Sequence, residues 1–156
     1  MKLVRIISSL YKNGTAQVYY ENNISRMFRL SQGVRQRSIL SPYLYNIYTD
    51  LLWKELEEDS DVGTSLHDIF TGVVMYADDI ILLSPTISGL QKLADKCVSY
   101  CNNLGVAINA GKTELLASGI SATPDCFLAM DHTRILPGKS LKHLGFLWNI
   151  NHNSKH

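Results

Sequence analysis

The sequence predicts an α+β fold in which a small antiparallel sheet packs on helices. Apolar residues at helical spacing alternate with short runs suited to strands, in the order helix, hairpin, helix, hairpin, helix and short strands. No internal repeat or low-complexity tract interrupts this order, and a hydrophobic fraction of 46% is ordinary for a globular protein. We therefore expect one domain over residues 1–148 and a polar tail over residues 149–156.

The N-terminal part is predicted to form a helix and a hairpin. Apolar residues recur at helical spacing over residues 3–10, and Asn13-Gly14 follows as a stop signal. Two runs rich in aromatic and β-branched residues, 16–20 and 24–30, flank the turn residues Glu21-Asn22-Asn23.

A second helix is predicted from Ser41 to about Glu58. Ser41 suits the N-cap and Pro42 suits the first helical position. The polar stretch 59–67 contains a glycine and is typical of a surface loop. The apolar face of the helix is expected to comprise Leu44, Ile47, Tyr48, Leu51 and Leu52.

A tight hairpin with acids at its tip is predicted next. The apolar runs 72–76 and 80–83 are separated only by Ala77-Asp78-Asp79.

A third helix fits residues 88–104, with Gly105 as its stop. Its apolar stripe would comprise Leu90, Leu93, Ala94, Cys97, Cys101 and Leu104. Beyond it, short strands are expected at 106–108, 115–116, 126–130 and 141–148, with a loop at 120–124.

Composition limits the classes of function. The formal net charge is +1, so any basic surface must be local. Three cysteines without framework spacing favour a reducing compartment, and no apolar run approaches the roughly 18–20 residues of a membrane span. We expect a soluble protein of the nucleus or cytoplasm with no membrane partner. Cys97 and Cys101, four apart on a predicted helix, indicate a buried stripe and not half of a zinc site.

Asp78 and Asp79 need an explanation, because they lie between two almost wholly apolar runs. Paired short acids are common in turns for structural reasons alone, since they hydrogen-bond their own backbone. Alternatively, carboxylate oxygens bind Mg²⁺ or Mn²⁺, and polymerases place two such ions about 3.5–4 Å apart at the reacting phosphate.

Four blocks in register favour the second reading. Tyr76-Ala77-Asp78-Asp79 resembles the central active-site signature of reverse transcriptases, and Gly33 to Asn46 resembles the family's upstream block with glutamine and leucine-serine-proline. Gly105 to Thr113 resembles the next block, and Leu144-Gly145 resembles the primer-grip block. The sequence around them is most similar to enzymes of retrotransposons without long terminal repeats (non-LTR retrotransposons).

The resemblance implies a partial palm, with a remnant of the fingers, of a right-hand polymerase that adds deoxynucleoside triphosphates to a DNA primer on an RNA template. It implies Mg²⁺ (or Mn²⁺) at Asp78 and Asp79, and a catalytic role for Lys112 at the triphosphate. Lys112 taken alone is equally well a solvated turn lysine. Substrate and template binding is implied for Tyr76, Arg35, Gln36 and Arg37, and primer grip for Leu144 and Gly145.

A basic patch lies upstream of the acids. Arg26, Arg29, Arg35 and Arg37 fall within twelve residues that contain no acid. Contact with the nucleic-acid backbone is expected for Arg26 and Arg29, and a solvated strand face is the alternative. The histidines expected at the surface are His132, His143, His152 and His156.

Two departures from the family pattern bear on activity. The family's first metal-binding aspartate belongs upstream of these blocks, and no acid of this sequence has its setting, so we expect an incomplete metal site. Arg37 stands where the pattern has glycine. If the backbone is left-handed at this position, an arginine there would cost about 1–2 kcal/mol relative to glycine.

Three readings stay open. The chain could be part of a polymerase that is completed by missing polymerase segments or a full-length copy. It could be a non-catalytic module that holds an RNA–DNA duplex by its backbone, or a non-functional retrotransposon remnant. In each case we expect this chain alone to lack activity.

Overall fold

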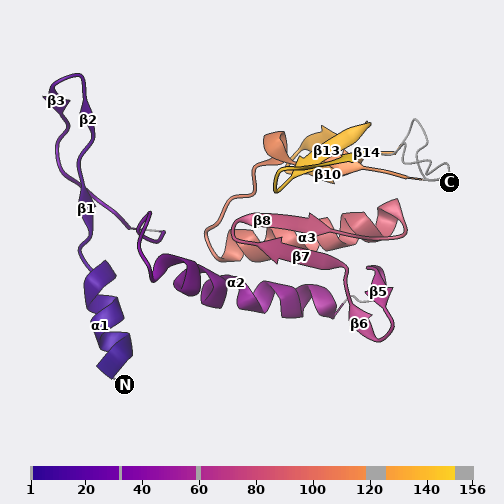
Figure 1. The fold of residues 1–156 in the computed structure, drawn as a ribbon, viewed down its shortest axis with the longest axis horizontal. Helices are drawn as coiled ribbons and strands as arrows, with labels where there is room; N and C mark the ends of the chain where they lie inside the picture. The colour runs from indigo at the N-terminus through magenta and orange to yellow at the C-terminus, as the bar shows by residue number, and fades with distance from the viewer. Residues whose placement is uncertain (1, 32, 59–60, 119–125, 150–156) are drawn as a thin grey trace. The chain divides into compact units, whose positions relative to one another are not determined.

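The computed structural model describes residues 2–31, 33–58, 61–118 and 126–149. By its internal contacts the chain divides into two compact units, Met1–Tyr48 and Thr49–His156. Figure 1 gives the order of the elements along the chain. The fold mixes helices with small two-stranded sheets, as expected for an α+β chain.

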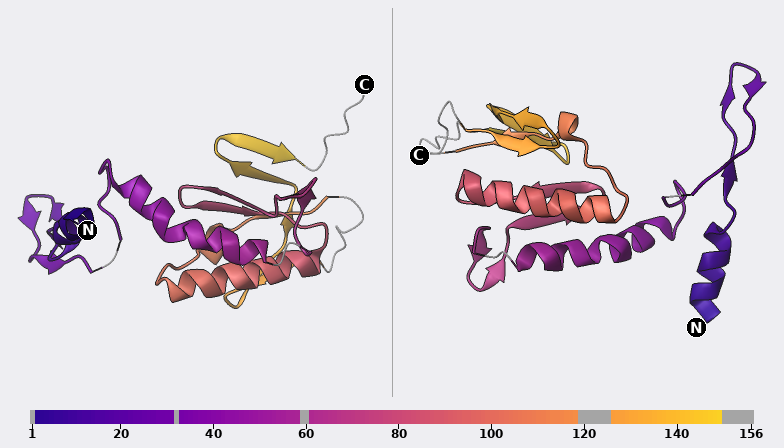
Figure 2. Two further views of the ribbon diagram at one scale, coloured as in Figure 1. Left: turned by 90° about the horizontal axis from the view of Figure 1, so that it is seen from below. Right: turned by 180° about the vertical axis from the view of Figure 1, so that it is seen from behind.

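The first unit contains the helix α1 and a long hairpin made of two short ladders. Both ladders are antiparallel, and each pairs an outgoing strand with a returning one. The predicted helix and hairpin are thereby confirmed (Figure 2). The elements are α1 (Lys2–Tyr11), β1 (Thr15–Ala16) paired with β4 (Phe28–Arg29), and β2 (Tyr19–Tyr20) paired with β3 (Asn23–Ile24).

The helix α2 (Ser41–Glu57) runs across the boundary between the units. The hairpins of the second unit are β5 (Ser65–Leu66) with β6 (Ile69–Phe70), β7 (Val73–Tyr76) with β8 (Asp79–Leu82), β10 (Leu128–Met130) with β11 (Thr133–Ile135), and β13 (Ser140–His143) with β14 (Phe146–Asn149). The remaining elements are α3 (Ile87–Asn103), the 3₁₀ turn η1 (Ala110–Lys112), and β9 (Leu115–Leu116), which pairs in parallel with β12 (Pro137–Gly138).

The helix α3 is the centre of the second unit, because both hydrophobic clusters pack against it. Its N-cap is Thr86, whose hydroxyl accepts a hydrogen bond from the Gly89 amide at 3.1 Å. One cluster joins it to α2 and the first hairpins, through Leu52, Leu56, Phe70, Val73, Leu93, Cys97 and Cys101. The other joins it to the later strands, through Ala94, Leu115, Leu128, Met130 and Ile135.

The side chain of Gln91 fastens α3 to β10. Its Nε2 donates to the Ala129 carbonyl at 2.7 Å, and its Oε1 accepts from the Ala129 amide at 2.8 Å. The primary amide therefore satisfies both backbone groups of one strand residue, as a neighbouring strand would.

Several predicted details of the elements are wrong. The buried face of α2 contains Thr49, Leu52 and Leu56, whereas Ile47 and Leu51 are exposed. Each of these sets keeps a helical spacing, so the sequence pattern alone could not tell the inner face from the outer one.

Other differences concern where strands and helices begin. No strand forms at 106–108, and the hairpin β5–β6 lies partly within the predicted loop. Ser41 is the first residue of α2, and its hydroxyl donates to the Arg35 carbonyl. The predicted loop at 120–124 lies outside the described residues. Among the described residues, no helix is long and apolar enough to cross a membrane.

Candidate active site

The hairpin β7–β8 carries the two acids at its tip. Its register pairs Tyr76 with Asp79, which leaves Ala77 and Asp78 as a two-residue loop. The predicted tight turn between antiparallel strands is confirmed, although Asp79 is the first residue of β8 and not a turn residue. Both carboxylates are exposed, while the strands behind them pack against the core through Val73, Met75, Ile80 and Leu82.

The loop holds Ala77 in an uncommon conformation. Its φ is +51°, whereas Asp78 is not among the residues with positive φ. A two-residue hairpin loop with positive φ at its first position is a type II′ turn, in which glycine is preferred there. Alanine in the left-handed region costs about 1–2 kcal/mol, and the paired strands on either side hold it in place.

His143 lies against this hairpin. Its Nδ1 is 4.0 Å from Oδ2 of Asp79, and its side chain is only 17% exposed, against 55% for Asp79. The expectation of a surface histidine is therefore wrong for His143. Its position directly before Leu144-Gly145 was the one signal in the sequence that could have pointed to it.

Leu144 and Gly145 form the two-residue loop between β13 and β14. The pairing of His143 with Phe146 leaves only these two residues in the loop, and their φ values are +49° and +83°. Two positive values define a type I′ turn, for which glycine at the second position is favourable. The structure thus explains Gly145 by backbone geometry, and the role in primer grip stays a prediction.

The predicted cationic residue Lys112 ends η1 and is exposed. Gln36 belongs to the other compact unit. The prediction that Gln36 and Lys112 face one nucleotide together with Asp78 therefore stays a prediction.

Arg35 to Ser38 form a turn that explains the glycine of the family pattern. The Ser38 amide donates to the Arg35 carbonyl at 3.3 Å, and Arg37, at the third position, has φ +60°. A turn with positive φ at this position only is type II, which favours glycine there. The left-handed backbone considered for Arg37 is therefore present.

The four arginines of the basic patch have different surroundings. Arg29 Nη2 donates to Asn13 Oδ1 at 3.2 Å, and Arg35 Nη2 donates to the Leu10 carbonyl at 3.1 Å, near the end of α1. Within the described part of the chain, the guanidinium groups of Arg26 and Arg37 have no hydrogen bond or ion pair. These two are the arginines with all donors available.

The acids and thiols differ in the chemistry they can support. Asp78 and Asp79 offer exposed hard oxygen donors, which fit Mg²⁺ with water and phosphate oxygens as its other ligands. Burial raises the pKa of the Cys97 thiol to about 12, with a smaller contribution from Cys101. Burial also raises the pKa of Cys101. Both thiols are therefore packing residues, as the sequence predicted. Among the described residues, no group of three or more His, Cys, Asp or Glu could hold a metal ion.

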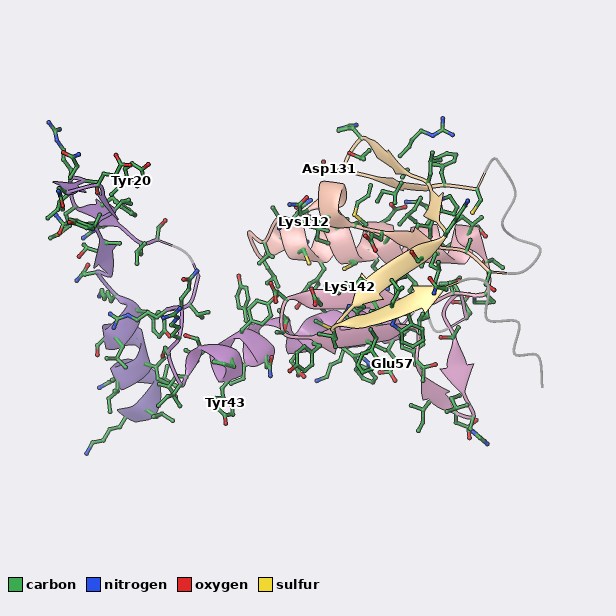
Figure 3. The ribbon with its side chains drawn as sticks, turned by 45° about the horizontal axis from the view of Figure 1, so that its top comes forward. Tyr20, Tyr43, Glu57, Lys112, Asp131 and Lys142 are labelled. Carbon is green, nitrogen blue, oxygen red and sulfur yellow. The ribbon has the colours of Figure 1, made fainter. Side chains whose placement is uncertain are left out.

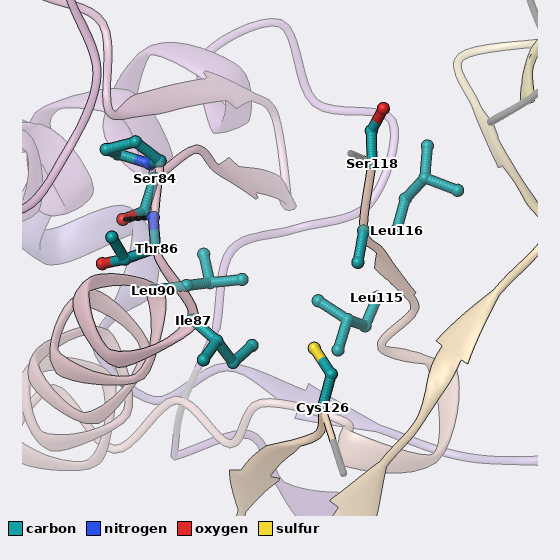
Figure 4. Close-up of a pocket in the computed structure, with 10 residues that line it drawn as sticks. Ser84, Thr86, Ile87, Leu90, Leu115, Leu116, Ser118 and Cys126 are labelled. Carbon is teal, nitrogen blue, oxygen red and sulfur yellow. Dashed lines mark hydrogen bonds between the residues drawn. The ribbon is translucent and has the colours of Figure 1, made fainter. Parts of the chain in front are cut away.

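A small pocket lies at the opposite end of β8 from Asp78. It is lined by Ser84 of the β8–α3 connection, Leu90 of α3, Leu115 of β9 and Cys126, which precedes β10 (Figure 4). Ser84 follows β8, whereas Asp78 precedes it. The pocket is therefore separate from the acid-bearing tip.

Comparison with known proteins finds a matching family and several relatives of this chain. The family described as "Reverse transcriptase (RNA-dependent DNA polymerase)" matches residues 1–147. The chain is 31% identical over 109 residues to the retrovirus-related Pol polyprotein from type-2 retrotransposable element R2DM of Drosophila melanogaster, covering 70% of this chain and 10% of that protein.

Two further relatives are Pol polyproteins from type-1 retrotransposable elements R2. The one from Nasonia vitripennis is 27% identical over 75% of this chain and 11% of its own length. The one from Popillia japonica is 26% identical over 84% of this chain and 20% of its own length. The chain thus spans about a tenth to a fifth of the curated relatives that it matches.

Proposed function

We propose that this chain, which belongs to the reverse transcriptase (RNA-dependent DNA polymerase) family, is part of the palm of a non-LTR retrotransposon polymerase. The observation that carries the proposal is the hairpin β7–β8, which presents Asp78 in its two-residue loop and Asp79 at the start of β8, while the strands behind them pack against the core. Adjacent carboxylates fixed by a rigid hairpin suit the binding of a hard divalent cation beside a phosphate.

Asp78 and Asp79 would hold Mg²⁺ or Mn²⁺. When bound, such ions activate the attacking hydroxyl of a primer and stabilise charge on the leaving phosphate oxygens. Asp78 in the loop would be the metal ligand, and Asp79 at the start of β8 would support it. Tyr76, opposite Asp79 in the ladder and 62% exposed, would pack beside the incoming nucleotide or the primer end.

The other site residues would bind nucleic acid and nucleotide. Lys112 would neutralise charge on the triphosphate, and Gln36 would contact the template strand. Arg26 and Arg37, with their donors available, suit phosphate oxygens better than Arg35, which already bonds the Leu10 carbonyl. Leu144 and Gly145 would approach the primer.

We propose that this chain alone does not extend a primer. A two-ion centre uses more carboxylate oxygens than Asp78 and Asp79 supply, so a further acid from another polymerase segment or copy would complete it. The same palm surface could hold an RNA–DNA duplex without chemistry, and the unpaired guanidinium of Arg26 favours that second candidate.

Primer extension with and without a further polymerase segment tests the proposal. The chain is incubated with Mg²⁺, a primed RNA template and deoxynucleoside triphosphates, and the assay is repeated with a polymerase segment that carries the upstream aspartate. We expect no extension by the chain alone, and extension by the combination that is lost on Asp78→Asn. Asp131→Asn is the matched control, because Asp131 also lies in a two-residue hairpin loop, between β10 and β11, and is exposed (Figure 3).

The outcomes separate the candidates. Extension by the combination that survives Asp78→Asn contradicts the assignment of Asp78. Duplex binding without extension in any combination supports the non-catalytic module. Isothermal titration with Mn²⁺ gives a second readout, in which Asp78→Asn should weaken binding and Asp131→Asn should not.

A further inference from the structure

The two compact units carry opposite charge. Residues 1–48 contain seven Lys and Arg and a single acid, Glu21, which gives a formal charge of +6. Residues 49–156 contain eight Lys and Arg and thirteen acids, which gives −5. The overall charge of +1 therefore conceals a basic N-terminal unit that is suited to an anionic partner.

The hairpin of this basic unit exposes aromatic and apolar side chains near its tip. Tyr19 is 67% exposed, and Tyr20, marked in Figure 3, is 69% exposed. Ile24 and Met27 are exposed to a similar degree. Exposed aromatic rings on a basic unit suit a partner that combines flat apolar faces with negative charge.

The hairpin holds Tyr19 in a defined position. Tyr19 pairs with Ile24 across the ladder, and its hydroxyl donates to Asn22 Oδ1 at 2.9 Å. Glu21 and Asn22 have φ +44° and +65°, which form a tight type I′ loop. Because the ring is tied to its own turn, a ligand that stacks on it loses little side-chain entropy.

The residues that precede β2 and follow β3 are also held together by hydrogen bonds. The Ser25 amide donates to the Val18 carbonyl at 2.9 Å, and the Val18 amide donates to Ser25 Oγ at 2.8 Å. Gln17 Nε2 reaches the Ser25 carbonyl at 3.2 Å. These bonds extend the pairing beyond β2 and β3, so the tip is a stiff platform.

Arg26 supplies a charge beside this platform. It follows Ile24, the cross-strand partner of Tyr19, by two residues, just beyond the end of β3. Arg26 is exposed, and its guanidinium bonds to no other described residue. From Asn22 to Thr49 the sequence contains no acid that could neutralise it.

We infer that the tip of the hairpin β2–β3 binds single-stranded nucleic acid, with a base stacked on Tyr19 and Arg26 on the adjacent phosphate. Single strands are the partner of this chemistry, because their bases are free to stack on aromatic rings while the backbone follows basic residues. In a duplex the faces of the bases are covered by their neighbours. The inference rests on the proposed function and deepens it, since the N-terminal unit would bind the template strand while that strand is still single-stranded.

Binding of labelled oligonucleotides to the full chain tests the inference. Fluorescence anisotropy compares oligouridylate of about twelve nucleotides, a length within the range that single-strand binding folds occupy, with an abasic oligomer of the same charge. Tyr19→Leu keeps a large apolar side chain without an aromatic face, and Tyr19→Phe keeps the ring without the hydroxyl. Tyr43→Leu is the matched control, because Tyr43 lies in the same unit and is also 67% exposed.

Stacking predicts a specific pattern. Tyr19→Leu should weaken oligouridylate binding by about fivefold or more, whereas Tyr19→Phe and Tyr43→Leu should stay within about twofold of the parent chain. None of these variants should change binding to the abasic oligomer. Arg26→Gln should weaken binding to both oligomers and reduce the salt dependence by about one ion.

Two results would overturn the inference. One is equal binding of oligouridylate by the Tyr19→Leu and Tyr43→Leu chains. The other is an equal loss of affinity for both oligomers in Tyr19→Leu, with Tyr19→Phe also weak, because ring stacking cannot act on an abasic strand. Either result leaves the extension assay with Asp78→Asn untouched, so failure of this inference is distinguishable from failure of the proposed function.

Discussion

His143 Nδ1 lies 4.0 Å from Oδ2 of Asp79, so the hairpin β13–β14 meets the first residue of β8. The loop that carries Leu144 and Gly145 is thereby held close to the hairpin that carries the acids. His143 is mostly covered and Asp79 is mostly open, which places the pair at the border between core and solvent. Two blocks that are distant in the sequence are neighbours in the structure through this pair.

The pair of His143 and Asp79 should contribute little to stability. In a double-mutant cycle with His143→Ala and Asp79→Asn, the coupling free energy of unfolding should not exceed about 1 kcal/mol, because Asp79 is exposed. Urea denaturation of the four proteins measures it. A coupling above about 2 kcal/mol would show instead that the pair behaves as a buried ion pair.

Replacing Arg37 by glycine should stabilise the turn at residues 35–38. Arg37 has φ +60° at the position of a type II turn that prefers glycine, so Arg37→Gly should raise the free energy of unfolding by about 1 kcal/mol. Gln36→Gly is the control within the same turn, and it should destabilise because Gln36 has no positive φ and glycine adds only entropy to the unfolded chain. An equal gain from Arg37→Ala would point to charge and not to backbone strain.

Local patterns predicted the elements that depend on neighbouring residues. The stripe of α3 was predicted correctly at Leu93, Ala94, Cys97 and Cys101, because it is the one apolar face of that helix. The β7–β8 hairpin followed from two apolar runs around Ala77-Asp78-Asp79. The fold class and the acids at the tip were therefore accessible from the sequence.

Properties that depend on distant residues were not accessible. α2 carries apolar residues on two faces, and only packing against Phe70, Val73 and α3 selects Leu52 and Leu56 for the interior. His143 looked like a surface residue because its neighbour, Asp79, is far away in the sequence. The charge division between the units could not be recognised without their boundary.

Substitution of Gly72 should disrupt the first hydrophobic cluster. A Cβ at Gly72 would lie 2.4 Å from two ring atoms of Phe70 and 3.1 Å from Gly63 Cα, so the buried ring would have to move. Gly72→Ala should lower the free energy of unfolding by about 1–3 kcal/mol, the range for overpacked cores. Gly111→Ala is the control, since its Cβ would meet only the side-chain oxygen of Asn109, at 3.3 Å. Equal stability of both variants in urea denaturation would contradict the tight packing of Phe70.

Loss of the Gln91 amide should loosen β10 from α3. Gln91→Leu removes both hydrogen bonds to Ala129 and leaves two backbone groups without their partner, which should cost about 1–3 kcal/mol. Gln91→Glu keeps an acceptor for the Ala129 amide, but its second oxygen would face the Ala129 carbonyl and the Asp95 carboxylate, so this variant should also be less stable while it still protects the Ala129 amide. Hydrogen exchange at the Ala129 amide checks this directly, since it should accelerate in Gln91→Leu and change less in Gln91→Glu. An unchanged rate in both variants would show that the Gln91 contact does not protect the strand.

The buried thiol of Cys97 should make the stability of the chain depend on alkaline pH. Burial raises the pKa of Cys97 from 9.0 to about 12, so the folded chain keeps this proton over a range of pH in which the unfolded chain releases it. The unfolded state then binds fewer protons, and the free energy of unfolding falls as pH rises above about 9, by up to about 1.4 kcal/mol per unit. Below the unfolded pKa the thiol is neutral in both states and contributes no slope.

Comparison of the parent chain with Cys97→Ala isolates this effect, because the titration of tyrosines and lysines is common to both proteins. Cys97→Ala should be less stable near neutral pH, since it removes a side chain that is 2% exposed in the core. The difference in the free energy of unfolding between the two proteins should shrink between about pH 8 and about pH 10.5. Only the parent chain releases the Cys97 proton when it unfolds, and this release favours the unfolded state more as the pH rises. Urea denaturation at several pH values under reducing conditions measures that difference. A difference that stays constant across this range would show that the Cys97 thiolate is no less favourable in the folded chain than in the unfolded one, and would contradict the packing of Cys97 as a neutral core residue.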